Sequence, residues 1–404
     1  MRKKVTIIIC IIISILLISS GIYIIPKLLM KFPDGAVISD KQSITEDGMY
    51  YIKAGKLYFL DAQNNASTVV CNKANCNHDN KDCYAYCPGL TQEILYYNGY
   101  IYVSDAWSEH SFDDGEVNYT CWNKIYQIKA DGSRRRNIYS SEEGSITQMK
   151  LVDGLLYFVY YKYPNGYKVN EWVADQYLYS YDLRWNKLEE VACIKADDEQ
   201  VSSILNIQRG NTRELYLTYK LSTENKNTVI LYKYDNGLSE IEKFDSISDI
   251  DFVFNENRQY MAIRDYQNDM VTLYTSTDFM KSRNKVLEVS GAWIDYMDDY
   301  MHIIKSDYSK IMLEYDTGQM YIANTMFTQE GSYISDIYNT DIAKNRIYID
   351  AHDYTGISPG TILYEDASEY AVMKLDEFMG SFYEKWEDID SKNLDKMDGF
   401  KIYE

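Results

Sequence analysis

Pairs of short apolar and aromatic stretches, each pair joined by a glycine turn, recur along the 404-residue chain and constrain its fold strongly. Residues 50–60 read YYIKAGKLYFL, residues 94–103 read ILYYNGYIYV, and residues 151–160 read LVDGLLYFVY. Two such stretches around a tight glycine turn are typical of a β-hairpin. The sequence therefore predicts repeated hairpins.

A second kind of hairpin phrase follows the first. Each consists of two strand-like stretches around Asp-Gly, Asp-Asn-Gly or a near equivalent, as in residues 124–140 (KIYQIKADGSRRRNIYS), 176–191 (QYLYSYDLRWNKLEEV), 229–244 (VILYKYDNGLSEIEKF) and 311–322 (IMLEYDTGQMYI). Two hairpins in succession form a four-stranded antiparallel sheet, the blade of a β-propeller. The units recur at intervals of roughly 40 to 50 residues, which is the spacing of propeller blades.

The pattern predicts an all-β fold, a β-propeller of about seven blades over residues 46–380, with residues 381–404 as a C-terminal tail or closing segment. The units begin near residues 40, 92, 146, 200, 246, 290 and 330. Their apolar faces are buried when neighbouring units stack. The 41 tyrosines agree with this fold, since tyrosine suits a half-buried pleated surface. A β-sandwich or a β-solenoid, which also strings hairpins together, is the alternative.

The N-terminal segment is apolar from Val5 to Ile25 and is preceded by a short basic stretch. A helix of this length spans roughly 30 Å, the thickness of the hydrocarbon core of a bilayer. By the positive-inside rule, residues 1–4 form a cytoplasmic stub and residues 5–29 a transmembrane helix or uncleaved signal anchor. Residues 30–45 are then a linker. We expect a single-pass protein of the cell membrane, with the body on the extracytoplasmic side.

Three other interpretations of this segment remain. A cleavable signal peptide has a shorter apolar region and a small-residue cleavage site, for which Ser19, Ser20 and Gly21 are available. A lipoprotein signal would need small residues just before its cysteine, whereas Cys10 follows three isoleucines. The third interpretation is a buried helix of a globular core, which the length and purity of the apolar run oppose.

The charge of the chain excludes one class of partner. With 61 acidic and 41 basic residues, the net charge is −20, and a field of that sign repels phosphate backbones. Nucleic-acid binding is therefore not expected. The tight basic run in the body, Arg134-Arg135-Arg136, is expected to be a solvated turn.

Residues 71–87 read CNKANCNHDNKDCYAYC and gather cysteine and histidine in one loop. Three thiolates and an imidazole make a full tetrahedral set for zinc. The candidate metal ligands are Cys71, Cys76, His78 and Cys83, and Cys87 could replace one of them. The spacing Cx4CxHx4C does not match the common zinc fingers.

Disulfides are the competing interpretation of this loop. Outside the cytoplasm, four cysteines can form two bridges, and Cys87 makes the local cysteine count even. Free thiols are the third option. Under either the zinc or the disulfide interpretation the role is structural, because the loop is rich in Asn, Asp and Lys and has few apolar residues to pack.

The hairpin phrases and the cluster together resemble a known group of proteins. IYQIKADGSRRRNIYS and ILYYNGYIYV resemble repeats of bacterial extracytoplasmic propeller proteins of the TolB-like and DUF5050-like kind. The cluster resembles a signature of membrane-anchored proteins of low-GC Gram-positive bacteria, although that signature ends at the third cysteine and Cys87 departs from it. The resemblance implies a propeller fold and an envelope location, and no agreed activity.

Most common catalytic motifs are absent from the sequence. There is no HExxH helix, Walker loop or GxGxxG turn, and the GxSxG pattern occurs once, as GISPG at residues 356–360. We therefore expect a non-enzymatic binding module for a cell-envelope protein, peptide or glycan, because a propeller gathers loops from every blade on one face. The alternative is an extracytoplasmic glycan hydrolase with carboxylates at the central channel. Two inward carboxylates in an open cleft would favour the hydrolase, and an apolar filling of the channel would oppose it.

Overall fold

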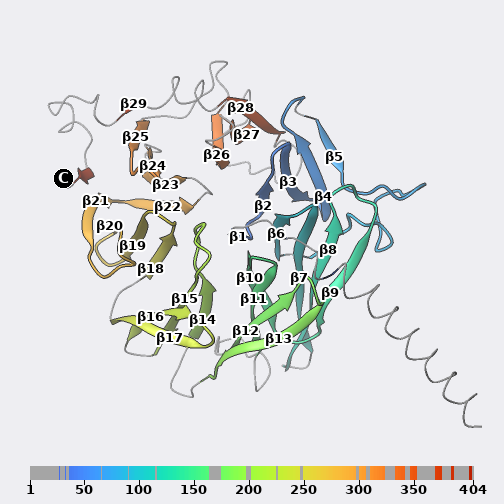
Figure 1. The fold of residues 1–404 in the computed structure, drawn as a ribbon, viewed down its shortest axis with the longest axis horizontal. Coiled ribbons are helices and arrows are strands. Elements are labelled where there is room, and N and C mark those ends of the chain that lie inside the picture. The colour runs from blue at the N-terminus through green and yellow to red at the C-terminus, as the bar shows by residue number, and fades with distance from the viewer. Residues whose placement is uncertain are drawn as a thin grey trace, which may run out of the picture.

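The computed structural model of the protein describes thirty β-strands, arranged as sheets around a central axis (Figure 1). The described residues are 27, 32, 36–64, 66–89, 91–113, 116–162, 174–196, 202–223, 226–245, 249–296, 300–305, 310–323, 333–341, 346–352, 369–374, 384–385 and 400–402.

The first three blades follow one another along the chain as antiparallel sheets. The first sheet contains β2 (Gln42–Ile44), β3 (Gly48–Lys53), β4 (Lys56–Asp61) and β5 (Ser67–Val69). The second contains β6 (Thr91–Tyr97), β7 (Tyr100–Asp113), β8 (Glu116–Lys129) and β9 (Arg135–Ser141). The third contains β10 (Ser145–Val152), β11 (Leu155–Lys162), β12 (Asp175–Asp182) and β13 (Lys187–Ile194), with β1 (Ala36–Ile38) added beside β10.

The remaining sheets continue the same order. The fourth contains β14 (Ser202–Ile207), β15 (Leu215–Ser222), β16 (Asn227–Tyr234) and β17 (Leu238–Asp245). The fifth contains β18 (Asp249–Phe254), β19 (Gln259–Asp265), β20 (Met270–Ser276), β21 (Asn284–Ser290) and β30 (Phe400–Ile402). The sixth contains β22 (Ala292–Tyr296), β23 (Tyr300–Lys305), β24 (Lys310–Glu314), β25 (Met320–Ala323) and β29 (Glu384–Lys385). The last contains β26 (Tyr333–Asp341), β27 (Arg346–His352) and β28 (Glu369–Lys374).

The all-β propeller is confirmed, but the number of complete blades is corrected. Among the described residues, six sheets have four or five strands, and the sheet β26–β28 has three. There are thus six complete blades in the described chain rather than the seven expected. The reason is visible in the pairing: β29 and β30, which follow β28, extend β25 and β21 of other sheets instead of completing the last one.

Tight glycine turns explain why the first hairpin of a blade forms where the sequence predicted it. The turns between β3 and β4, β6 and β7, and β10 and β11 each have two successive residues with φ between 48° and 88°; they are Ala54-Gly55, Asn98-Gly99 and Asp153-Gly154. Two positive φ values in succession define the turn that matches the twist of two-residue hairpins. Glycine, asparagine and aspartate adopt such φ values at little cost.

A β-bulge recurs in the fourth strand of four consecutive blades, where the extra residue is Ile138, Val191, Ile241 or Val286. Each bulge shifts the register between the third and the fourth strand at an apolar residue followed by tyrosine: Ile125/Tyr126, Leu178/Tyr179, Leu231/Tyr232 and Leu273/Tyr274. A bulge increases local twist. The repeated tyrosine phrases therefore correspond to a repeated backbone feature.

The apolar core lies between neighbouring sheets rather than inside any one of them. Between the second and third sheets, Leu95 and Ile125 pack with Met149, Leu151 and Phe158, and all five are at most 1% exposed. A fully buried apolar side chain of this size contributes about 1.5–3 kcal/mol. Each sheet thus depends on its neighbour to cover its apolar face, as the repeat pattern predicted.

The segment 36–40 lies near the centre of the ring (Figure 1). Strand β1 pairs with the innermost strand of the third sheet, through Ala36↔Val152, Val37↔Leu151 and Ile38↔Lys150. Asp40 then forms a bridge with Ile94 on β6 of the second sheet. The stretch expected to be a linker, 30–45, therefore contains β1 and β2.

The first and last sheets are neighbours, because β2 contacts β26. Among the described residues no strand is exchanged between these two sheets. The predicted stub and most of the predicted membrane-spanning segment, residues 5–29, lie outside the described residues. The residues that are described include no helix long and apolar enough to cross a membrane.

Candidate functional site

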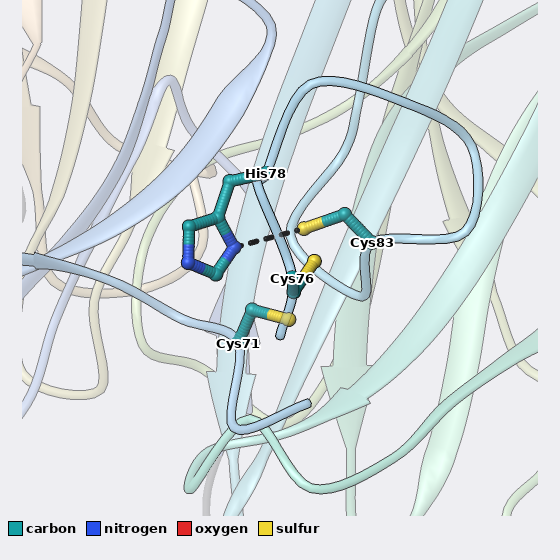
Figure 2. A group of neighbouring side chains, drawn as sticks. All are labelled: Cys71, Cys76, His78 and Cys83. Atoms are coloured by element: carbon teal, nitrogen blue, oxygen red, sulfur yellow. Dashed lines mark hydrogen bonds between the residues drawn. The ribbon is translucent and has the colours of Figure 1, made fainter. Parts of the chain in front are cut away.

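The cysteine-histidine loop connects β5, the outer strand of the first blade, to β6, the inner strand of the second. Figure 2 shows the three cysteine sulfurs and the imidazole of His78 turned toward one another. One ligand atom from each of Cys71, Cys76, His78 and Cys83 lies within 4.8 Å of the other three. His78 Nδ1 is 3.4 Å from Cys83 Sγ. The structure thus brings together the four residues that the sequence indicated.

The spacing of these atoms suits a tetrahedral ion. Zinc bonds of about 2.0–2.3 Å place the ligand atoms roughly 3.5–3.8 Å apart, so closure around an ion would require only a small inward movement. Cys71, Cys76 and Cys83 are free thiols, with no disulfide bond among them. Cys87 is buried in the core between the first two blades and does not belong to the group.

Backbone N–H groups surround the sulfur atoms. Burial raises the pKa of Cys71, but hydrogen bonds from the backbone of Lys73 and Tyr84 outweigh burial and leave it below its usual value. The backbone N–H of Ala85 donates to Cys83 Sγ at 3.3 Å, although burial still raises the pKa of Cys83 to about 12. Such donors stabilise a thiolate, and a bound cation would ionise all three thiols.

The backbone of the loop is held in an uncommon conformation at the cluster. His78 has φ = 61° and Asn75 has φ = 57°, both in the left-handed region. Histidine and asparagine visit this region more often than most residues, yet it remains unfavourable for any residue with a Cβ atom. The left-handed His78 backbone turns the imidazole toward the three cysteines.

Two blades fix the loop from either side. On the first blade, the Cys87 N–H donates to Gly55 O at 2.8 Å. On the second blade, Arg135 Nη1 on β9 donates to Cys83 O at 3.0 Å and to Tyr86 O at 2.6 Å. The Asn72 N–H donates to Gly132 O at 2.9 Å. The cluster therefore sits at the junction of the first and second blades and joins them.

A second polar group lies on the inner strands of the ring. Asp40 forms an ion pair with Arg209 at 2.7 Å, and the Ser39 hydroxyl donates to the carboxylate of Glu93 on β6. Burial raises the pKa of Glu93 to about 7, and the neighbouring charge of Asp40 adds to this. Sequence reasoning missed Glu93, because its environment is built by residues more than fifty positions away.

The carboxylates of β18 are also held by a cation. Lys220 Nζ on β15 contacts both Asp249 and Asp251, the latter at 3.0 Å. The Tyr296 hydroxyl donates to Asp251 Oδ2 at 3.1 Å. These contacts engage Asp249 through one oxygen and Asp251 through both.

The basic run Arg134-Arg135-Arg136 is not a simple solvated turn. Arg135 and Arg136 are half-buried on β9, where Arg135 stacks 3.8 Å from the ring centroid of Tyr126. Arg136 Nε donates to Gln127 Oε1 at 2.6 Å. A cationic side chain that faces an aromatic one on the neighbouring strand is the sequence signal that could have identified these two arginines as half-buried.

The fold is similar to that of several solved structures. A prolyl endopeptidase has a TM-score of 0.50 at 11% identity, over 87% of this chain and 50% of that one. The β-propeller domain of the Trilobed protease from Pyrococcus furiosus has a TM-score of 0.46 at 10% identity, over 85% and 96%. An uncharacterised protein from Listeria monocytogenes has a TM-score of 0.41 at 13% identity, over 71% and 79%.

These similarities concern the fold alone, and the chain spans half the length of the prolyl endopeptidase. No family model matches the sequence, and no curated protein is similar to it. The resemblance to TolB-like and DUF5050-like repeats therefore stays a prediction.

Proposed function

We propose that the chain is a non-enzymatic, extracytoplasmic binding module, whose first two blades are joined by a structural zinc ion. The non-enzymatic part of this proposal rests on one observation, the ion pairs formed by the inner-strand carboxylates. Asp40, Asp249 and Asp251 are each held by a cationic side chain. A hydrolase needs two carboxylates available to substrate and water, and these are occupied by partners within the protein.

Strand β1 supports the same proposal. It adds Ala36, Val37 and Ile38 to the inner edge of the third sheet. Val37 packs against the core between the second and third blades, and Ile38 against the core between the third and fourth. An apolar strand at this position occupies space that a substrate channel would require.

Zinc is the metal that the donor set favours. Thiolates select soft or borderline ions, and three cysteines with one histidine are a frequent ligand set of structural zinc. Catalytic zinc keeps one position open for water, whereas Cys71, Cys76, His78 and Cys83 would fill all four. The ion would therefore stabilise the loop without activating a water molecule.

Metal analysis tests this part of the proposal. We expect one zinc per purified chain, lost in Cys76→Ser and His78→Ala, and we expect a chelator to lower the melting temperature. Cys193→Ser, which changes a thiol on β13 of the third blade, is the matched control and should retain the metal. A metal-free protein whose mass shows the loss of two hydrogens per cysteine pair would establish disulfides instead.

The location is proposed on the N-terminal sequence, in which an apolar run from Val5 to Ile25 follows basic residues. The body then lies outside the cytoplasm, attached by a single membrane-spanning helix. Protease added to intact protoplasts should digest the body and leave a cytoplasmic marker protein intact. Full protection of the body would refute this orientation.

Glu93 is the specific observation that favours a hydrolase as the second candidate. A carboxyl group with a pKa of about 7 beside the charged Asp40 has the properties of a general acid. If the chain hydrolyses a glycan, Glu93→Gln should abolish the release of reducing ends while leaving glycan binding intact. A wild-type chain that releases none from a panel of envelope glycans between about pH 5 and about pH 8 removes this candidate.

A further inference from the structure

A groove of about 410 Å³ lies between the cysteine-histidine loop and the outer part of the second blade. Lys81 and Tyr86 line it from the loop, Trp122 and Lys124 from β8, and Arg135 and Arg136 from β9. The volume falls within the range of small-molecule and sugar-binding sites. The groove is separate from the inner-strand carboxylates and uses none of the four candidate zinc ligands.

The charge of the groove is opposite to that of the chain. Four of its lining residues are cationic, and Asp82 is the acidic one. Elsewhere in this acidic protein, cations such as Lys129, Lys195 and Lys233 form ion pairs with carboxylates. Within the part of the chain that the structure describes, none of the groove's four cations is ion-paired to a carboxylate. Unpaired cations gathered in a concavity are typical of an oxyanion site.

The two arginines of the groove are held in place before any ligand arrives. Arg135 is fixed by the carbonyls of Cys83 and Tyr86 and by its stacking on Tyr126. Arg136 is oriented through its Nε, which donates to Gln127 Oε1, so its terminal nitrogens remain for a bidentate contact. A preorganised guanidinium loses little conformational entropy on binding a carboxylate or a phosphate.

Aromatic side chains form the rest of the wall. Trp122 is half-buried, and Lys124 Nζ lies 4.9 Å from the centroid of its ring. Tyr86, which lines the groove from the loop, is also half-buried. Flat aromatic surfaces beside hydrogen-bond donors suit a sugar ring, whose C–H face packs on the aromatic while its substituents meet the polar groups.

We propose that this groove binds an acidic saccharide, which it recognises through a carboxylate or phosphate substituent held by Lys124 and Arg136. This inference rests on the proposed binding function and names its site and its ligand class. Both substituents are oxyanions, a planar one in the carboxylate and a tetrahedral one in the phosphate. The experiment below distinguishes between them.

Calorimetric titration of the full-length chain, in a non-ionic detergent, tests the proposal. The probes are a tetragalacturonate, a phosphorylated maltotetraose, neutral maltotetraose and a tetraglutamate peptide. We expect one of the two acidic saccharides to bind at least about tenfold more tightly than the neutral one, with the stronger acidic saccharide identifying the substituent. The variant Lys81→Glu/Lys124→Glu should weaken that binding by about tenfold or more.

The control variant reverses the charge of two lysines that lie at a distance from the groove. Lys281→Glu/Lys243→Glu alters two exposed lysines of other blades and should bind like the wild type. Equal binding of acidic and neutral probes, equal loss in both variants, or capture of acidic peptides in preference to acidic saccharides would overturn the inference. Hydrolysis of a bound probe would contradict the proposed non-enzymatic function, while leaving the assignment of the groove standing.

Discussion

At the scale of single residues, the side chain of Lys150 departs most clearly from ordinary protein chemistry. It lies on β10 with no exposed surface, although lysines are almost never fully buried without a partner. Its Nζ reaches the Glu214 carbonyl oxygen at 3.5 Å. Burial lowers the pKa of Lys150 to about 7. Keeping this side chain charged and buried therefore destabilises the folded protein near neutral pH.

Lys150→Met is expected to stabilise the protein. Below about pH 7 the folded state must keep a buried ammonium group charged, whereas between that pH and 10.5 the folded protein binds fewer protons than the unfolded chain. The wild-type stability therefore rises with pH across this interval. Urea unfolding should show a gain of about 2–4 kcal/mol for Lys150→Met at pH 7, which shrinks toward about pH 10.

An exposed lysine provides the control for this measurement. Lys281→Met should change the stability by less than about 0.5 kcal/mol at either pH, because this side chain is exposed. An equal or smaller gain for Lys150→Met than for Lys281→Met would mean that Lys150 is not charged and buried in the folded state.

The residue scale also shows what the sequence could and could not predict. Cys71, Cys76, His78 and Cys83 could be grouped from the sequence because they lie within thirteen residues and share one chemistry. Glu93 and Lys150 could not be singled out, because their surroundings are built by distant segments. A carboxylate becomes unusual only when Ser39 and Asp40 are brought beside it by the fold.

At the scale of elements, the turn between β8 and β9 supports the cysteine-histidine loop. Gly132 has φ = 68°, and a Cβ atom there would lie 2.8 Å from Cys71 N and 2.9 Å from Asn72 N. These are backbone atoms, which cannot move aside without shifting the first cysteine of the cluster. The loop and the turn are therefore packed as one unit, although they belong to different blades.

Gly132→Ala is expected to weaken the metal site. The clash should displace Cys71 and lower the zinc affinity by about tenfold or more. It should also lower the free energy of unfolding by about 1–3 kcal/mol beyond the cost of placing an alanine at a positive φ. Gly99→Ala supplies the comparison, because Gly99 has φ = 76° and no atom within 4 Å of an added Cβ. Competition with a chromogenic chelator measures affinity, and equal losses in both variants would show that the turn does not support the site.

Elements were predicted well where the signal is local. The expected starts near residues 92, 146 and 290 correspond to β6, β10 and β22, because glycine turns and tyrosine phrases mark each unit. Strand β1 was missed, since three residues carry no period that can be recognised. The partners of β29 and β30 were also beyond prediction, because strand pairing over such distances depends on the assembled ring.

At the scale of the whole molecule, the segment after β1 ties the inner edges of two blades together. The Ser39 hydroxyl accepts the N–H of Met149 on β10 at 2.7 Å and donates to Glu93 on β6. The Ser39 N–H donates to Met149 O at 2.7 Å. One buried serine therefore connects the N-terminal segment to the second and third blades.

Ser39→Ala is expected to destabilise the protein by about 1–3 kcal/mol, because it leaves the buried Met149 N–H without its acceptor. Ser203→Ala is the matched control, since the Ser203 hydroxyl is buried without a partner among the described residues, and its removal should cost almost nothing. Urea unfolding monitored by tyrosine fluorescence gives both values. Similar costs for the two variants would mean that the central segment adds little to the ring.

The bulge shared by four consecutive blades also bears on how this chain arose. A one-residue insertion recurs at the same place in the fourth strand of these blades, opposite Ile125/Tyr126, Leu178/Tyr179, Leu231/Tyr232 and Leu273/Tyr274. Copying of one ancestral gene segment that already carried the insertion accounts for all four. These four blades are then paralogues within a single polypeptide.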